Sequence, residues 1–236
     1  MNLLLLSSSR ANNSEYLAPC LSLIDNTLGT IRDVLFIPYA GLRVNYDDYV
    51  AMVQQALKPL NIHVKGIHEF ANPADAIVNA QAVMVGGGNT FVLLAKLYEH
   101  NLIQTLQQKT AAGMPYIGWS AGSNIAGLSI RTTNDMPIIE PPSFQALGLL
   151  PLQLNPHYTD FVPVGFHGET RDMRLAEFMH VDADTAIIGL PEGTALRLSG
   201  TTLRYEGSEN AFLFRGGVKN AITPTSDLSG LLQKQV

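Results

Sequence analysis

The chain of 236 residues is long enough to form one large domain around a single sizeable core. Charged residues make up 15% and hydrophobic residues 46% of it, which is typical of a globular protein and excludes a disordered one. The formal net charge of −5, with no basic block, argues against a protein that binds nucleic acid by neutralising phosphates. Because no internal repeat or linker interrupts the sequence, we expect residues 1–236 to form a single α/β domain.

The cysteine content and the first residues of the chain bear on the cellular compartment of the protein. Cys20 is the only cysteine, so neither an intramolecular disulfide nor a cysteine metal cluster can form. The apolar start of the chain lacks the basic residues of a signal peptide, and polar residues at 7–10 end it early. No apolar stretch approaches the length needed to span a bilayer. We therefore expect a cytoplasmic protein with no membrane partner.

The first half of the chain alternates apolar runs with segments of helical spacing. Continuous apolar runs are typical of strands covered on both faces. We expect strands at 3–6, 34–37, 62–67, 83–85 and 115–119, and helices at 46–57, from 73 onward, at 91–98, 103–112 and 121–127. This alternation predicts a three-layer, doubly wound α/β fold with a mostly parallel sheet. In such a fold the site lies at the carboxyl ends of the strands.

The second half of the chain has a different pattern. Residues 131–142 are polar and rich in proline, which indicates a long surface excursion that could form a wall of the site. An apolar run at 149–154, a helix at 170–179 and a strand at 186–190 follow. Short strands at 196–198 and 211–214, separated by glycine-rich turns, indicate a small β meander. We expect this meander to be a small β extension at the C-terminus.

The segment Gly118-Trp119-Ser120-Ala121-Gly122 joins a predicted strand to a predicted helix. It has the G-x-S-x-G form of a nucleophile elbow, in which a sharp turn exposes a serine at the sheet edge. A side chain at either glycine would collide with the neighbouring strand or helix in so tight a turn. Taken alone the pattern is weak, since a Gly/Ser-rich turn without chemical function looks the same. Together with the residues that follow, it indicates Ser120 as a nucleophile.

A serine needs a base that takes its proton and a third group that orients the base. His157 directly follows an apolar run, behind a proline, and is expected on the same sheet edge as Ser120. Two carboxylates compete for the third position, Glu192 just past a predicted strand and Asp135 in the polar excursion. Triads occur in several chain orders, so order does not decide between them, whereas placement at a strand end favours Glu192. Without a catalytic role, each carboxylate is an ordinary loop or turn residue.

Acyl transfer also needs two donors aimed at the developing oxyanion. The N–H of Ala121 is one candidate. The Gly86–Gly88 loop can supply the other, because backbone without side chains can approach a substrate closely. This loop lacks the third glycine of the dinucleotide fingerprint and the lysine of a P-loop, which disfavours phosphate binding. We expect neither a metal nor a cofactor, since the sequence has no H-E-x-x-H motif and no cluster of ligands at metal-binding spacing.

Five blocks together resemble the peptidase E family of serine peptidases: GGGNT at 86–90, GWSAG at 118–122, RTTNDMP at 131–137, NPH at 155–157 and GETR at 168–171. The resemblance extends to about residue 193 and implies a fold related to cyanophycinase and the class I glutamine amidotransferases. It implies hydrolysis of dipeptides with an N-terminal aspartate through an aspartyl-enzyme ester, without metal or cofactor. It also implies Ser120 as nucleophile, His157 as base, and Gly88 with Ala121 as oxyanion donors.

The resemblance leaves the third triad member open, because Glu192 and Asp135 both lie in family-like segments. It implies Arg171 as the partner of the substrate's aspartyl side chain, and a guanidinium does match a carboxylate bidentately. Without the resemblance, Arg171 would be interpreted as a solvated helix residue. Asn89 is implied to contact the substrate as well. The expected partner is thus a small peptide, and the sequence leaves the oligomeric state open, a homodimer included.

Two other classes of function also fit the sequence. A different serine hydrolase, such as an esterase or a cyanophycinase-like enzyme acting on β-aspartyl bonds, would share the elbow. A non-catalytic α/β protein whose glycine loop holds a small anion would bind its ligand without turnover. A glutamine amidotransferase is disfavoured, because its elbow nucleophile is a cysteine and Ser120 occupies that position.

Overall fold

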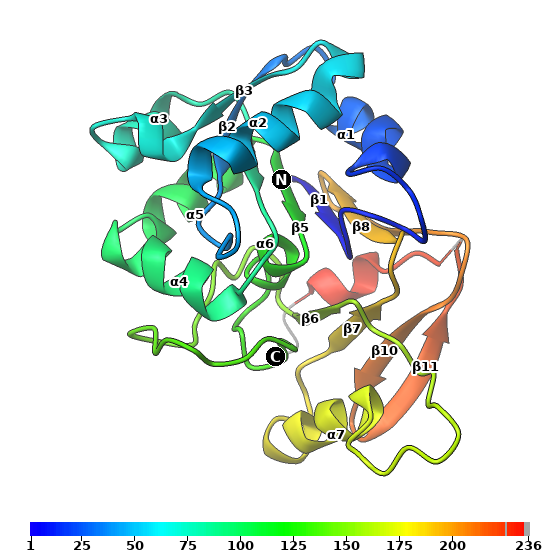
Figure 1. Ribbon diagram of the computed structural model, residues 1–236. Helices are drawn as coiled ribbons and strands as arrows, with labels where there is room; N and C mark the ends of the chain where they lie inside the picture. Colours follow the sequence, from blue (N-terminus) through cyan, green and yellow to red (C-terminus); the bar gives the residue numbers. More distant parts are fainter. Residues whose placement is uncertain (225, 234–236) are drawn as a thin grey trace.

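The computed structural model describes residues 1–224 and 226–233 and contains two sheets within that part of the chain (Figure 1). The large sheet has the strand order β3-β2-β4-β5-β1-β8-β9, and the small sheet has the order β11-β10-β7-β6. The strands are β1 (Asn2–Leu6), β2 (Asp33–Ile37), β3 (His63–Gly66), β4 (Val83–Val85), β5 (Tyr116–Trp119), β6 (Gln153–Pro156), β7 (Ile187–Leu190), β8 (Ala195–Ser199), β9 (Thr202–Glu206), β10 (Ala211–Arg215) and β11 (Val218–Ile222).

Helices connect the strands and cover the large sheet (Figure 1). The α-helices are α1 (Leu21–Leu28), α2 (Tyr46–Leu57), α3 (Pro73–Asn79), α4 (Thr90–Glu99), α5 (Ile103–Ala111), α6 (Ala121–Asn124) and α7 (Arg171–Val181), and the short 3₁₀ helices are η1 (Ala18–Cys20), η2 (Lys58–Leu60), η3 (Ile67–Glu69) and η4 (Ser229–Leu232). No helix in the described part of the chain combines the length and apolarity needed to cross a membrane.

The parallel part of the large sheet runs from β3 through β2, β4 and β5 to β1. The hairpin of β8 and β9 continues it with antiparallel strands beyond β1. In the β1–β5 pair, Leu6 lies opposite Trp119, so the two strands end side by side. Because parallel strands end at one edge, the loops after β1, β2, β4 and β5 gather there.

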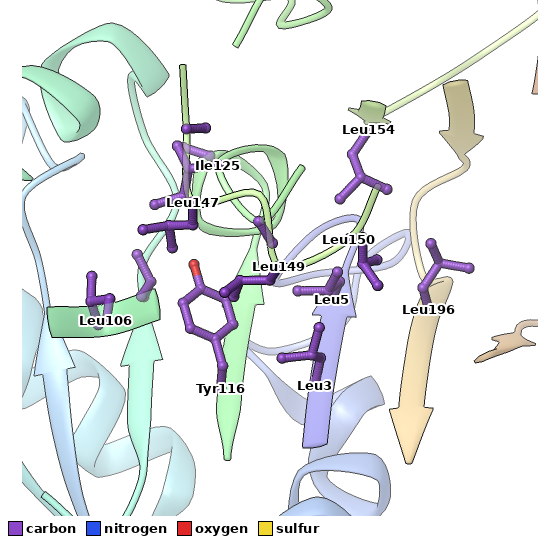
Figure 2. Close-up of a cluster of buried hydrophobic side chains, with 14 of the residues drawn as sticks. Leu3, Leu5, Leu106, Tyr116, Ile125, Leu147, Leu149, Leu150, Leu154 and Leu196 are labelled. Carbon is purple, nitrogen blue, oxygen red and sulfur yellow. The ribbon is translucent and has the colours of Figure 1, made fainter. Parts of the chain in front are cut away.

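Alternate side chains of these strands enter two separate cores, since successive residues of a strand point to opposite faces. Leu3 and Leu5 of β1 pack in a core with α3, α4 and α5, and Figure 2 shows them beside Tyr116 of β5. Leu4 and Leu6 pack on the other face with α1 and α2. Burial on both faces explains why the strands are continuous apolar runs in the sequence. The predicted three-layer α/β fold with a mostly parallel sheet is confirmed.

Most of the predicted elements are present within one or two residues of their expected bounds, and the helix after the elbow is the exception. It was expected over 121–127, whereas α6 ends at Asn124. The last turn tightens, with Ala126 N donating to the Ser123 carbonyl and Gly127 N to the Asn124 carbonyl, and Leu128 N then donates to the Leu152 carbonyl at 3.0 Å. A Cβ at Gly127 would lie 2.8 Å from that same carbonyl oxygen, so glycine permits the close approach.

The expected C-terminal β meander is wrong in its connectivity. The β8–β9 hairpin extends the large sheet, whereas β10 pairs antiparallel with β7 and β11 in the small sheet. The strand before His157 also lies in the small sheet, where β6 pairs parallel with β7. This pairing was missed because apolar spacing predicts strands, while tertiary packing decides which edge each strand joins.

Candidate active site

Ser120 lies at the turn from β5 into α6 with φ 53° and ψ −114°, a strained backbone conformation for a residue with a side chain. Its N–H donates to the Leu6 carbonyl at 3.2 Å, which holds the turn against the end of β1. A Cβ at Gly118 would lie 2.4 Å from the Gly122 carbonyl oxygen, and a Cβ at Gly122 would lie 2.1 Å from the Val85 carbonyl oxygen. Both glycines are therefore required by close backbone contacts, and the turn has the geometry of a nucleophile elbow.

Ser120, His157 and Glu192 form a continuous hydrogen-bonded chain. Nε2 of His157 lies 3.0 Å from Ser120 Oγ, and its Nδ1 lies 2.7 Å from Glu192 Oε1. The carboxylate can only accept, so we assign the ring proton to Nδ1, which leaves Nε2 free to accept from the serine hydroxyl. This arrangement can remove a proton from Ser120 and stabilise the imidazolium that results.

Asp135, the other carboxylate considered from sequence, has different partners. Its Oδ2 accepts from Thr90 N at 2.7 Å and from Thr90 Oγ1 at 2.5 Å. Thr90 is the first residue of α4, where a negative charge is favourable beside the helix N-terminus. The structure thus brings Glu192 to His157 and brings Asp135 to the start of α4.

Gly88 and Ala121 each line a pocket that Ser120 also lines. Gly88 has φ 139°, and a Cβ there would lie 2.0 Å from the Ala40 carbonyl oxygen, so only glycine fits. A Cβ at neighbouring Gly87 would lie 3.0 Å from Ser120 Cβ, which shows how closely this loop approaches the serine. Ala121 is the first residue of α6, so its N–H has no acceptor within the helix. Two backbone donors are therefore available near Ser120.

A polar pocket of about 220 Å³ adjoins Ser120, and Arg171 at the start of α7 lines it. Thr133, Asn134 and Asp135 of the 131–142 excursion form part of its wall, as the sequence suggested. Burial lowers the pKa of Arg171, nearby Arg174 lowers it further, and Asp135 opposes both effects. Among the described residues no carboxylate forms an ion pair with Arg171. The guanidinium is thus available to an anionic ligand.

A second, more apolar pocket of about 440 Å³ meets the first at Ser120 and His157. The residues that line it include Tyr16, Leu42, Val44, Met52, Gly88 and Asn89. The Asn89 side chain, which was expected to contact substrate, is engaged in structural hydrogen bonds. Its Oδ1 caps α4 by accepting from Val92 N at 3.1 Å, and its Nδ2 donates to the Met136 carbonyl at 2.9 Å.

Ser7 and Ser8 also shape the site, although the sequence reasoning did not select them. The Ser7 hydroxyl donates to the Leu190 carbonyl at 2.7 Å and accepts from His157 N at 2.9 Å. The Ser8 hydroxyl accepts from Gly193 N at 3.1 Å, in the turn that carries Glu192. The available signal was their position, because they directly follow a buried strand at the carboxyl edge.

In the described part of the chain, no cluster of three His, Cys, Asp or Glu side chains is arranged to hold a metal ion.

Comparison with known proteins agrees with an α/β enzyme that carries a serine nucleophile on an elbow. The model of Peptidase family S51 matches residues 3–205. The chain belongs to this family and is a serine peptidase. Peptidase E of Shewanella amazonensis is 53% identical over 230 residues, with 97% of this chain and 98% of that protein covered. Peptidase E of Shewanella denitrificans is 49% identical, with 98% and 99% covered.

Two solved structures share the fold at low sequence identity. The structure of a putative peptidase E protein from Listeria monocytogenes has a TM-score of 0.66 and 24% identity, covering 87% of this chain and 97% of that one. The structure of a peptidase from an acI-B1 Actinobacterium has a TM-score of 0.72 and 18% identity, covering 96% of both chains. At these identities the likeness supports the fold alone.

Proposed function

We propose that this serine peptidase hydrolyses dipeptides with an N-terminal L-aspartate, Asp-Xaa, through an aspartyl ester on Ser120. The observation that carries this proposal is the polar pocket lined by both Ser120 and Arg171, whose guanidinium has no ion pair among the described residues. The resemblance to the peptidase E family points to the same substrate, and the full-length relatives described above carry the name Peptidase E.

The charges of the polar pocket match both ends of an N-terminal aspartyl residue. A guanidinium can bind the side-chain carboxylate in a fork of two hydrogen bonds. Asp135 lines the same pocket and supplies a negative charge for the substrate's α-ammonium group. A volume of about 220 Å³ leaves little room for residues preceding the aspartate. The pocket therefore favours a free N-terminus.

The proposed reaction follows the geometry of the hydrogen-bonded chain. His157 Nε2 takes the proton of Ser120 Oγ as that oxygen attacks the peptide carbonyl, and Glu192 stabilises the imidazolium. The oxyanion accepts hydrogen bonds from the N–H groups of Gly88 and Ala121. The imidazolium then protonates the leaving amine, and water attacks the ester with His157 again acting as the base. The residue that leaves occupies the apolar pocket.

We also propose that the protein works in the cytoplasm, where a free thiol persists. The supporting observation is that Cys20 is a free, buried cysteine.

The test is the release of free aspartate from Asp-Leu, with Leu-Asp and the β-linked isomer as control substrates. We expect the wild type to cleave Asp-Leu alone, with or without a chelator, and Ser120→Ala to be inactive. Arg171→Ala should lower kcat/KM for Asp-Leu by about 10²-fold, which corresponds to losing a charged hydrogen-bonded pair of about 3 kcal/mol. Arg174→Ala is the matched control on the same helix, and it should retain near-wild-type activity because that side chain is exposed and pairs with Glu169.

Other outcomes identify the competing functions. Cleavage of the β-linked isomer in preference to Asp-Leu would indicate a cyanophycinase-like specificity, and turnover of simple esters alone would indicate an esterase. Tight binding of aspartate without turnover, unchanged in Ser120→Ala, would indicate a binding protein. Full activity of Ser120→Ala on Asp-Leu would contradict the proposed mechanism.

A further inference from the structure

The hydroxyl of Tyr49, on α2, lies at a junction of three hydrogen bonds beside the site. It donates to the Gly87 carbonyl at 3.0 Å and accepts from Trp119 Nε1 at 3.3 Å, and it lies 3.3 Å from the Tyr16 hydroxyl. A phenol has one proton and two acceptor positions, so this set uses its full capacity when Tyr16 is the other donor. The Tyr49 side chain is buried and has no place in the proton-transfer chain of Ser120, His157 and Glu192.

The Gly87 carbonyl belongs to the same peptide unit as the Gly88 N–H. In a planar trans peptide the C=O and N–H point in opposite directions, so fixing one fixes the other. Tyr49 therefore holds the orientation of the one backbone donor that lies on the glycine loop. Glycines have little intrinsic preference for a particular φ and ψ, so this peptide needs an external constraint to keep one orientation.

Tight contacts fix Tyr49 itself against the glycine loop and the elbow. A Cβ at Gly86 would lie 2.6 Å from the Tyr49 hydroxyl oxygen, so the loop packs directly against that hydroxyl. Phe36 packs edge-on against the Tyr49 ring with centroids 4.9 Å apart, and stacks on Trp119 at 5.6 Å. Trp119 directly precedes the nucleophile, so Tyr49 connects the glycine loop to the elbow.

The direction of these hydrogen bonds is also favourable for catalysis. Burial raises the pKa of Tyr49, so the hydroxyl keeps its proton and remains a donor to Gly87 throughout the neutral range. Hydrogen bonds in series polarise one another, and a donor on the Gly87 oxygen makes the Gly88 N–H a stronger donor at its other end. The effect grows as negative charge develops on the substrate oxygen.

We propose that Tyr49 is a positioning residue for the oxyanion hole, whose hydroxyl orients and polarises the Gly87–Gly88 peptide so that the Gly88 N–H meets the developing oxyanion. This inference rests on the proposed acyl transfer at Ser120. Tyr49 lines the apolar pocket, but Tyr49→Phe keeps the ring there and removes only the hydroxyl, which acts on the transition state through Gly88. Its loss should therefore lower kcat and leave KM nearly unchanged.

The test compares Tyr49→Phe with Tyr98→Phe. The Tyr98 hydroxyl also donates to a backbone carbonyl, that of Gln145 at 2.9 Å, but at the far end of α4. We expect Tyr49→Phe to lower kcat for Asp-Leu about tenfold, less than the ~10²–10³-fold that follows removal of an oxyanion donor. KM should stay within about twofold, because the ground-state carbonyl makes weaker use of the hole. Tyr98→Phe should match the wild type in both constants.

A second variant and a binding measurement distinguish a loss of positioning from a loss of folding. Tyr16→Phe keeps the ring that lines the apolar pocket, removes the outer hydrogen bond to Tyr49, and should give a smaller decrease in kcat than Tyr49→Phe. An aspartyl aldehyde, which forms a tetrahedral adduct with the serine, should bind Tyr49→Phe more weakly by about the same factor as kcat. The product aspartate should bind equally well. Equal kcat in Tyr49→Phe and wild type, or equal losses of aldehyde and aspartate binding, would overturn the inference.

Failure of the proposed function is distinguishable from failure of this inference. If the wild type does not cleave Asp-Leu, the proposed substrate is wrong, and the rate at which a fluorophosphonate labels Ser120 still reports on the oxyanion hole. Slower labelling of Tyr49→Phe, with Tyr98→Phe unchanged, would then support the inference by itself. Equal labelling rates in all three proteins would reject it.

Discussion

Ser120 and His157 both have backbone conformations that residues with side chains rarely adopt, with φ of 53° and 54°. Each such conformation costs about 1–3 kcal/mol, so the surrounding structure must hold it in place. Leu6 and Ser7, two neighbours at the end of β1, do so: the Leu6 carbonyl accepts from Ser120 N and the Ser7 hydroxyl accepts from His157 N. The strained nucleophile and base are thus both hydrogen-bonded to the short segment at the end of β1.

Among single residues, variants of the two candidate carboxylates should differ in their effects on kcat and KM. Glu192→Gln keeps the size of the side chain and removes the charge that orients His157 and stabilises its imidazolium. We expect kcat to fall by about 10²–10⁴-fold with little change in KM, in line with the loss of the carboxylate in other triads. Asp135→Asn should mainly raise KM, because it weakens the α4 N-terminus and the charge that faces the substrate's amine. Steady-state kinetics on Asp-Leu checks both variants, and the reverse pattern would assign the triad to Asp135.

At the scale of elements, the elbow depends on how closely α6 approaches β4. A methyl group at residue 122 would lie 2.1 Å from the Val85 carbonyl oxygen, which belongs to a central strand and has no room to move. We expect Gly122→Ala to destabilise the protein by about 3 kcal/mol, at the upper end of the usual effect of overpacking. Gly230→Ala, where a Cβ meets nothing within 4 Å, is the control and should be neutral. Denaturant unfolding measures both, and a Gly122→Ala protein as stable as the wild type would contradict the packing argument.

The elements themselves were largely predictable from sequence. Strands buried on both faces are unbroken apolar runs, and α2 begins at Tyr46 and ends at Leu57, as the spacing of its apolar residues predicted. Local patterns predict less well where a tertiary contact ends an element. Just after α6, Leu128 N donates to the Leu152 carbonyl, 24 residues further along the chain, and the spacing of apolar residues does not predict this contact.

In the whole molecule, the site is built from residues that follow strands of both sheets. Ser120 follows a strand of the large sheet, whereas His157 and Glu192 follow β6 and β7 of the small one. The sequence predicted these residues to meet because each follows an apolar run. However, it placed them on one sheet edge, since strand pairing is not encoded in the spacing of apolar residues. Ser7 was missed for the same reason, because its role depends on a second sheet lying against the end of β1.

Ser7 should therefore matter to the whole molecule as well as to the site. Ser7→Ala leaves the His157 N–H without its acceptor, and an unmet buried group costs about 1–3 kcal/mol. The Leu190 carbonyl loses one of its two hydrogen bonds and keeps the one from Tyr158 N. We expect lower stability together with a lower kcat, because His157 loses a constraint. Ser129→Ala is the matched control: this buried serine accepts from Gln153 Nε2 at 2.6 Å, away from His157. It should lose stability without losing kcat per folded molecule, and an equal loss of kcat in both variants would show that Ser7 has no particular role in the site.

The proposed mechanism requires Ser120 to carry the aspartyl group during turnover. The most direct measurement is mass spectrometry of the wild type quenched in acid during hydrolysis of aspartyl p-nitroanilide, a substrate whose good leaving group favours accumulation of the ester. We expect one aspartyl group per chain, located on the peptide that contains Ser120 and absent from Ser120→Ala. Turnover with an aspartyl group on another residue, or undiminished turnover by Ser120→Ala, would contradict it.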